Sequence, residues 1–162
     1  MTEASETAGV IAPPPLIALA AVILGALLDW LMPAYVLSLL LSRDVRITIG
    51  SLLVAAGIVL AGIARASFVR SDTNVNPYKP SNALVTTGIF AYVRNPMYVG
   101  LALMVAGIGL ARASDWTLVL LVGAALLIHF GVVRREERYL EAKFGETYRS
   151  YMRAVPRYGI SL

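Results

Sequence analysis

The chain has 162 residues, of which 58% are hydrophobic and 15% are charged, and its formal net charge is +4. Soluble domains contain about 45–50% apolar and about 25% charged residues, so this composition excludes an ordinary soluble globule. It also excludes a disordered chain, which lacks apolar residues, and a nucleic-acid-binding domain, whose basic residues cover a hydrated surface. The class that remains is an integral membrane protein.

The available side chains limit the chemistry of any site. The sequence has no cysteine and one histidine. A disulfide framework, a thiolate nucleophile and a multi-histidine metal site are therefore excluded, and we expect no metal.

Four apolar segments are candidates for crossing a membrane: residues 14–41, 47–64, 96–111 and 116–133. Strand-like alternation is absent from them, and helices satisfy their backbone groups in lipid. The sequence predicts an all-α polytopic helical membrane protein with about four transmembrane helices, a single domain over residues 1–162 and a flexible tail over residues 1–13. Small residues in the spans predict close contacts between helices: Gly57, Gly62, Ala102, Ala106, Gly107 and Gly123.

The first apolar segment is longer than one span and contains Asp29 and Pro33. Because proline lacks the N–H that a helix interior needs, we expect the helix to end near Trp30 and an interfacial piece to follow. Asp29 then lies at the far membrane face beside an anchoring tryptophan. If the helix continues unbroken instead, Asp29 falls near the midplane, where an acidic residue indicates function.

Basic residues predict the orientation, because cytoplasmic loops hold the excess of Lys and Arg. The polar segments 65–95 and 134–162 carry eleven of them, Lys79 included, and the opposite face carries three: Arg43, Arg46 and Arg112. We therefore expect both termini in the cytoplasm. The two polar segments then meet on one side of the membrane, and we expect a cofactor site there.

The segment before the third span ends in Arg94-Asn95-Pro96. Asparagine followed by proline is typical of an N-cap and the first residue of a helix. The free N–H groups at that helix end and the charge of Arg94 form a seat for a carboxylate or phosphate. The alternative is that Arg94 is only a positive-inside anchor.

The second polar segment contains the adjacent Glu136 and Glu137, and Gly145 is predicted to end its helix. A charge run of this kind is most often a solvated helix, but paired glutamates are less expected at a membrane exit than Lys and Arg. His129 lies one or two turns before Glu136 on a similar helix face. This histidine also fits simple hydrogen-bonded packing.

These segments follow one order along the chain: residues 94–100, then Glu136-Glu137, then Phe144-Gly145, Tyr148, Tyr151 and Val155-Pro156. The order resembles the isoprenylcysteine carboxyl methyltransferase and phospholipid methyltransferase superfamily. The likeness covers residues 72–158, which we expect to be the catalytic half. The superfamily usually has Arg-His-Pro at the first motif, where this chain has Asn95, which keeps a hydrogen-bond donor but lacks a titratable ring.

The resemblance implies S-adenosylmethionine at the cytoplasmic membrane edge and a lipophilic or lipid-anchored substrate that enters from the bilayer. We expect the membrane to be a bacterial-type plasma membrane. The carboxylate of S-adenosylmethionine suits Arg94, its ribose and amino groups suit Glu136 and Glu137, and its adenine suits an aromatic slot. The predicted catalytic residues are Arg94 and Glu137. The predicted cofactor site comprises Leu84, Thr87, Gly88, Tyr92, Arg94, Asn95, Pro96, Tyr98, Gly100, Glu136, Glu137 and Tyr148.

Two other functions remain as alternatives. An intramembrane NADPH-dependent reductase of the sterol type is similar in its carboxyl-terminal region, but such chains are generally longer and lack the adjacent glutamates. A non-enzymatic helical membrane subunit leaves Arg94 and the glutamate pair without a purpose. The glycine-rich turn that soluble methyltransferases place after a strand has no counterpart here, since Gly107-Ile108-Gly109 lies inside an apolar span.

Overall fold

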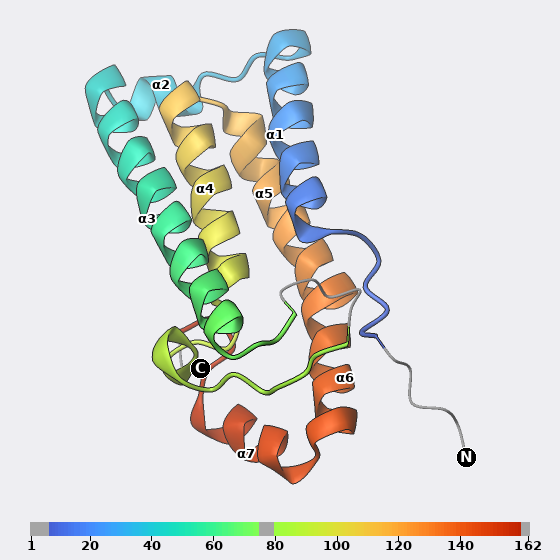
Figure 1. Cartoon of the computed structure of the whole chain (residues 1–162). Helices are drawn as coiled ribbons and strands as arrows, with labels where there is room; N and C mark the ends of the chain where they lie inside the picture. Colours follow the sequence, from blue (N-terminus) through green and yellow to red (C-terminus); the bar gives the residue numbers. More distant parts are fainter. Residues whose placement is uncertain (1–6, 75–79, 160–162) are drawn as a thin grey trace.

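In a computed structural model, residues 7–74 and 80–159 are described, and all regular structure within them is helical. Four helices form the bundle in Figure 1: α1 (Pro14–Leu31), α3 (Arg43–Arg70), α4 (Pro96–Arg112) and α5 (Asp115–Ile128). α5 continues through the π-helical turn η2 (His129–Val133) into α6 (Arg134–Phe144). The remaining pieces are short: α2 (Val36–Leu40), the 3₁₀ turn η1 (Gly88–Ala91) and α7 (Glu146–Ala154).

The membrane-spanning character of the bundle is confirmed. α1, α3 and the continuous helix Asp115–Phe144 are long and apolar enough to cross a membrane, and α4 is a shorter apolar helix of 17 residues. The apolar part of the continuous helix ends at Val133, where the charged residues of α6 begin. The all-α fold predicted from the sequence is therefore the observed one.

The first apolar segment breaks where proline predicts. α1 ends at Leu31 and is followed by the short helix α2. The carboxylate of Asp115 accepts hydrogen bonds from the backbone N–H groups of Val36 and Leu37, at 3.1 and 3.0 Å. Asp29 lies in the last turn of α1, so the alternative of an unbroken helix with Asp29 near its middle is wrong.

α3 is longer than the predicted span of residues 47–64, because it begins at Arg43 and ends at Arg70. Ser42 caps its first turn by accepting a hydrogen bond from the N–H of Val45. Its other end carries Arg65 and Arg70, so the helix continues past the apolar stretch into polar surroundings.

Glycines bring α3 and α4 into backbone contact. A Cβ on Gly107 would lie 2.5 Å from the carbonyl oxygen of Gly50, and one on Gly100 would lie 2.7 Å from that of Gly57. This confirms the close approach predicted at Gly57 and Gly107. Gly62 and Gly123 have open space where a Cβ would stand, so the prediction is wrong for them, and the contacts of Ala102 and Ala106 stay a prediction.

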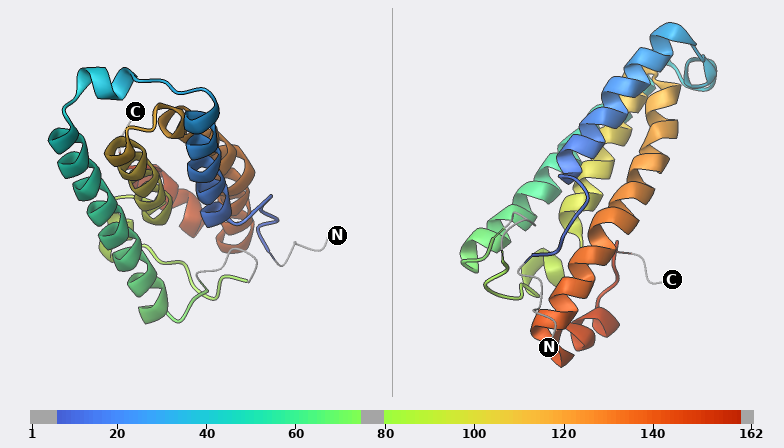
Figure 2. Two further views of the ribbon diagram at one scale, coloured as in Figure 1. Left: turned by 90° about the horizontal axis from the view of Figure 1, so that it is seen from above. Right: turned by 90° about the vertical axis from the view of Figure 1, so that its right-hand side faces the viewer.

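α4 is the central helix of the bundle, because it contacts α3, α5 and α1, and α1 also packs against α5. α4 lies between α3 on one side and α1 and α5 on the other, as the view along the bundle in Figure 2 shows. The loop of residues 80–95 and helices α6 and α7 all lie at one end, opposite α2 (Figure 1). We call this the polar end. Lys79, one of the basic residues counted in its favour, lies outside the described residues.

The segment before α1 packs against η2, and the flexibility expected of residues 1–13 stays a prediction. Ile11 donates its backbone N–H to the carbonyl oxygen of Gly131 at 3.2 Å, and its side chain lies where Gly131 has no Cβ. Arg135 donates to the carbonyl oxygen of Gly9 at 2.8 Å, and Val10 is buried. These contacts tie residues 9–11 to the α5–α6 helix, and the first six residues of the predicted tail lie outside the described part of the chain.

Candidate active site

An open cavity lies at the polar end, between the start of α4, the end of α3 and the inner face of α6. The volume of this cavity is about 120 Å³. Its wall combines apolar side chains with Arg94, Glu136 and Glu137. Six aromatic side chains also line it: Phe68, Phe90, Tyr98, Tyr139, Tyr148 and Tyr151.

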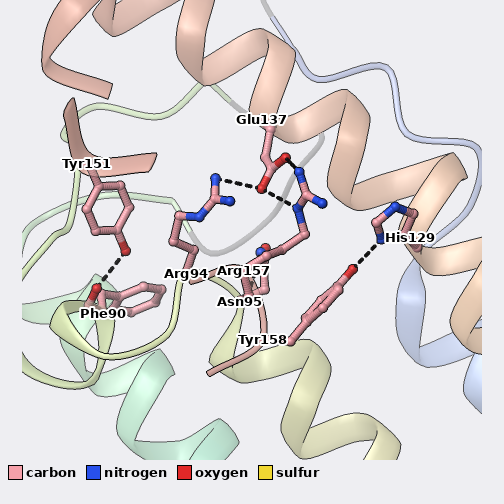
Figure 3. Close-up of polar contacts among 8 residues, drawn as sticks. All are labelled: Phe90, Arg94, Asn95, His129, Glu137, Tyr151, Arg157 and Tyr158. Carbon is pink, nitrogen blue, oxygen red and sulfur yellow. Dashed lines mark hydrogen bonds and ion pairs between the residues drawn. The ribbon is translucent and has the colours of Figure 1, made fainter. Parts of the chain in front are cut away.

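Arg94, Glu137 and Arg157 form an ion cluster beside the cavity (Figure 3). Nη1 of Arg94 lies 2.9 Å from Oε1 of Glu137. Arg157 donates from Nε to Oε1 at 2.9 Å and from Nη2 to Oε2 at 2.7 Å. Both carboxylate oxygens of Glu137 are therefore held by arginines. The side chains of Arg94 and Glu137 are only 9% and 10% exposed, so these charges depend on one another for compensation.

Arg94 keeps hydrogen-bonding capacity in spite of this ion pair. Within the described part of the chain, neither its Nε nor its Nη1 has a hydrogen-bond partner, because the contact with Glu137 is close but poorly aligned. Buried N–H groups of a guanidinium are rarely left unpaired, since each lost hydrogen bond is costly. Nη1 keeps its ion pair with Glu137, whereas Nε has neither a hydrogen bond nor an ion pair among the described residues, so the guanidinium of this cavity-lining residue has capacity left for an anionic ligand.

Asn95 starts α4 as predicted but does not cap it with its side chain. Its Nδ2 and its backbone N–H both donate to the carbonyl oxygen of Arg157, each at 3.2 Å. The N–H of Arg94 donates to the carbonyl oxygen of Pro156 at 3.0 Å. The chain entering α4 is thus held by the segment that follows α7.

Glu136 is the second acidic group on the cavity wall and lies beyond the apolar span. It accepts a hydrogen bond from the hydroxyl of Tyr98 at 2.8 Å. Burial raises the pKa of Glu136 to about 7, and the charge of Glu137 adds to the rise, whereas the bond from Tyr98 opposes it. Near neutral pH this carboxyl group therefore exists in both protonation states.

Tyrosines from α6 and α7 fix the loop that closes the cavity. Tyr151 donates its hydroxyl to the carbonyl oxygen of Phe90 at 2.7 Å, and burial raises the pKa of Tyr151 to about 12. Tyr139 accepts from the N–H of Ser81 at 3.2 Å. Tyr148 is 2% exposed, and burial raises its pKa above the usual range. Tyr148 and Tyr151 therefore stay protonated near neutral pH, and all three side chains form hydrogen-bonding or aromatic walls.

The sequence model of a family described as phospholipid methyltransferase matches residues 45–147. The chain belongs to this family. The matched residues run from α3 to the start of α7 and include Arg94 and both glutamates of the cavity.

Two curated proteins show the same relationship. The chain is 33% identical over 109 residues to a protein-S-isoprenylcysteine O-methyltransferase of Schizosaccharomyces pombe, which covers 67% of this chain and 44% of that protein. It is 32% identical over 80 residues to the cobalt-zinc-cadmium resistance protein CzcN of Cupriavidus metallidurans, covering 49% of this chain and 37% of that protein. The chain thus spans less than half the length of these relatives. No solved structure matches it.

The structure brings together most of the residues that the motifs of this family predicted, and it leaves four outside. The cavity is lined by Leu84, Arg94, Asn95, Pro96, Tyr98, Glu136, Glu137 and Tyr148. Thr87, Gly88 and Tyr92 are exposed away from it, because η1 turns Phe90 inward and leaves Tyr92 74% exposed. Gly100 lies in the contact between α4 and α3.

Some site residues escaped the sequence reasoning. Phe90 and Tyr139 line the cavity, and neither follows from a spacing rule, because loop geometry decides which aromatic side chain points inward. Tyr151 and Arg157 lie after the last membrane segment, where an aromatic or basic residue is unremarkable. The available signal was that Tyr151 belongs to the motif order that carries the resemblance and that Arg157 directly follows Val155-Pro156.

His129 takes no part in the cavity wall, although it was expected to share a face with Glu136. Its Nδ1 lies 2.8 Å from the hydroxyl of Tyr158 (Figure 3). The π-helical turn that begins at His129 places an extra residue in the helix and so changes the register of everything after it. The packing alternative for His129 therefore describes its observed contacts.

Proposed function

We propose that the protein is an integral membrane methyltransferase that uses S-adenosylmethionine and methylates a lipophilic or lipid-anchored acceptor. One observation carries the proposal beyond family membership: in the part of the chain that the structure describes, Arg94, whose buried Nε has no hydrogen-bond partner and whose Nη1 meets only Glu137, lines a cavity that also holds Glu136. A cation and a carboxyl group across one aromatic-lined cavity suit an amino-acid zwitterion, which is what the methionine part of the cofactor presents.

The residues present fit this ligand. The methionine carboxylate would take the free N–H groups of Arg94, at the positive end of the α4 dipole. The amino group would bind the ionised form of Glu136. Adenine would lie among aromatic side chains such as Tyr139 and Tyr148, whose ring faces also stabilise a cation.

The bound cofactor supplies a methyl group activated by its positively charged sulfur. The chain's own part is to orient and to exclude water: alignment of two reacting groups supplies most of the rate in a displacement that needs no protein nucleophile. Glu137 has both oxygens occupied by arginines, so we assign it the positioning of Arg94 rather than direct contact with the cofactor.

The acceptor side of the cavity is apolar. Phe68 and Met97 line it from the ends of α3 and α4, next to the buried Val85 and Phe90. A lipid tail is compatible with such a wall, and a hydrophilic acceptor is not favoured by it. We place the polar end and both termini in the cytoplasm of a bacterial-type plasma membrane, on the distribution of basic residues.

Methyl transfer from labelled S-adenosylmethionine into a lipid extract tests the proposal, with the full chain in lipid nanodiscs. We expect label in the lipid fraction and a loss of at least about tenfold in Arg94→Lys, because an ammonium lacks the planar fork and small displacements cost on the order of a hundredfold in rate. Saturating cofactor separates this positioning defect from weaker binding.

Arg153→Lys is the matched control, since Arg153 is exposed on α7 and pairs with Glu146. It should keep full activity. A wild-type chain that neither binds the cofactor nor transfers label would contradict the proposed function. Full transfer by Arg94→Lys would remove Arg94 from the catalytic residues.

A further inference from the structure

The segment of residues 155–158, which we call the C-terminal strap, follows α7 and lies beyond the region that the family model matches. It runs beside the start of α4. The backbone of Arg94 donates to the carbonyl oxygen of Pro156, and Asn95 donates twice to the carbonyl oxygen of Arg157. Three hydrogen bonds therefore fix the strap to the two residues that precede α4.

The other end of the strap is also tied down. The Tyr158 hydroxyl pairs with Nδ1 of His129 on η2, so the strap reaches from the start of α4 to the α5–α6 helix (Figure 3). This fixed path brings the guanidinium of Arg157 to Glu137.

Arg157 binds the carboxylate of Glu137 through two hydrogen bonds, which is stronger than the single contact that Arg94 makes with it. Its Nε and Nη2 meet the two carboxylate oxygens at 2.9 and 2.7 Å, which is the bidentate geometry that matches a guanidinium to a carboxylate. These hydrogen bonds raise the pKa of Arg157. Glu137 contacts the guanidinium of Arg94 through Oε1 alone. The fork of Arg94 is therefore left unused by Glu137.

The net charge of the cluster of Arg94, Glu137 and Arg157 also indicates that Arg94 is available to a ligand. Two guanidinium groups share one carboxylate, so the cluster carries one positive charge in excess. Without Arg157, Glu137 and Arg94 would cancel one another, and Arg94 would be free to turn its fork onto Glu137. The excess charge appears on the cavity side, because Arg94 lines the cavity and Arg157 does not.

We propose that Arg157 is a positioning residue of the cofactor site: it saturates Glu137 and so keeps the fork and charge of Arg94 available to a ligand carboxylate. The inference rests on the proposed function, which supplies that carboxylate. It predicts that Arg157 matters only for ligands that carry the carboxylate, although Arg157 itself touches no ligand.

Two ligands test this with the full-length protein in detergent: S-adenosylhomocysteine, which has the carboxylate, and methylthioadenosine, which lacks the amino-acid part. Calorimetric titration of Arg157→Gln should show affinity for S-adenosylhomocysteine reduced by about tenfold and affinity for methylthioadenosine unchanged. Arg157→Lys retains the charge and should recover most of the loss.

Arg153→Gln is the control, because it removes the same charge from an exposed site on α7 and should change neither affinity. An equal loss for both ligands in Arg157→Gln, or a variant that fails to fold, would show a merely structural strap and overturn the proposal. Unchanged binding of S-adenosylhomocysteine would overturn it as well. A wild-type protein that binds neither ligand would instead contradict the proposed function on which the inference rests.

Discussion

Asn95 occupies the position at which related motifs have histidine, and its amide holds the carbonyl oxygen of Arg157. An amide cannot take up a proton near neutral pH, so this position does not serve as an acid or base in this chain. Glu136 is the cavity group whose pKa lies near neutrality. We therefore expect Glu136 to make ligand binding in the cavity depend on pH near neutrality.

This gives a pH prediction for ligand binding. Burial raises the pKa of Glu136 to about 7, so the folded protein retains a proton there that an unfolded chain releases at lower pH. Glu136 therefore favours folding at low pH, and this contribution is lost as pH rises through about 7. A ligand amino group needs the ionised form, so affinity for S-adenosylhomocysteine should rise up to about tenfold between about pH 6 and about pH 8.

Titration calorimetry at a series of pH values measures this rise. Glu136→Gln should bind more weakly at the upper end of the range and lose the pH dependence. A variant that keeps the same rise would show that another group causes it.

At the scale of elements, the contact between α3 and α4 decides where the cavity lies. Gly50 and Gly57 on α3 meet Gly107 and Gly100 on α4 at backbone distance. Small residues at such a contact permit the packing that holds helices together in lipid, where burial of apolar surface gives no driving force. The same contact sets the end of α3, and with it Phe68, against the start of α4.

Two glycine-to-alanine substitutions distinguish the effect of this helix contact on stability from the effect of helix propensity. Gly107→Ala places a methyl group 2.5 Å from the carbonyl oxygen of Gly50 and should destabilise the protein by about 1–3 kcal/mol. Gly62→Ala meets nothing and should stabilise α3 by roughly 0.5–1 kcal/mol. Thermal unfolding in one detergent measures both. Equal shifts of the same sign would contradict the packing that the structure shows.

At the scale of the whole molecule, both long polar segments gather at one end of the bundle, and the short connection through α2 lies at the other (Figure 1). The polar end carries most of the basic residues. A cofactor and a lipid-borne acceptor can meet there, because the cavity lies at the level where the apolar helices give way to charged ones.

Accessibility of introduced cysteines tests the proposed orientation. The chain has no cysteine of its own. Ser150→Cys, exposed on α7 at the polar end, should react with a membrane-impermeant maleimide only from the cytoplasmic side. Ser42→Cys, exposed before α3 at the opposite end, should react only from outside. The reverse pattern would invert the topology and place the cavity outside the cytoplasm.

The sequence by itself determined the helices and the identity of the main polar groups. Apolar length gives the spans, since lipid permits no other backbone arrangement, and Pro33 and Gly145 end helices through their own backbone chemistry. Two predicted spans separate the motif around Arg94 from the paired glutamates along the chain, which places both motifs on the same side of the membrane. This was enough to predict one shared site. These features depend on local sequence, so they can be read along the chain.

Only the tertiary structure decided which partner each charge takes. Arg157 reaches Glu137 because the C-terminal strap hydrogen-bonds beside Asn95, and Tyr92 points outward because η1 turns Phe90 into the cavity. The π-helical turn separates His129 from Glu136, and Val10 and Ile11 pack against that turn. These pairings join residues that are far apart along the chain. The conformation of the loops and the register of the helices decide which of them meet. Their free energies depend on burial and alignment in three dimensions, which local residue patterns do not encode.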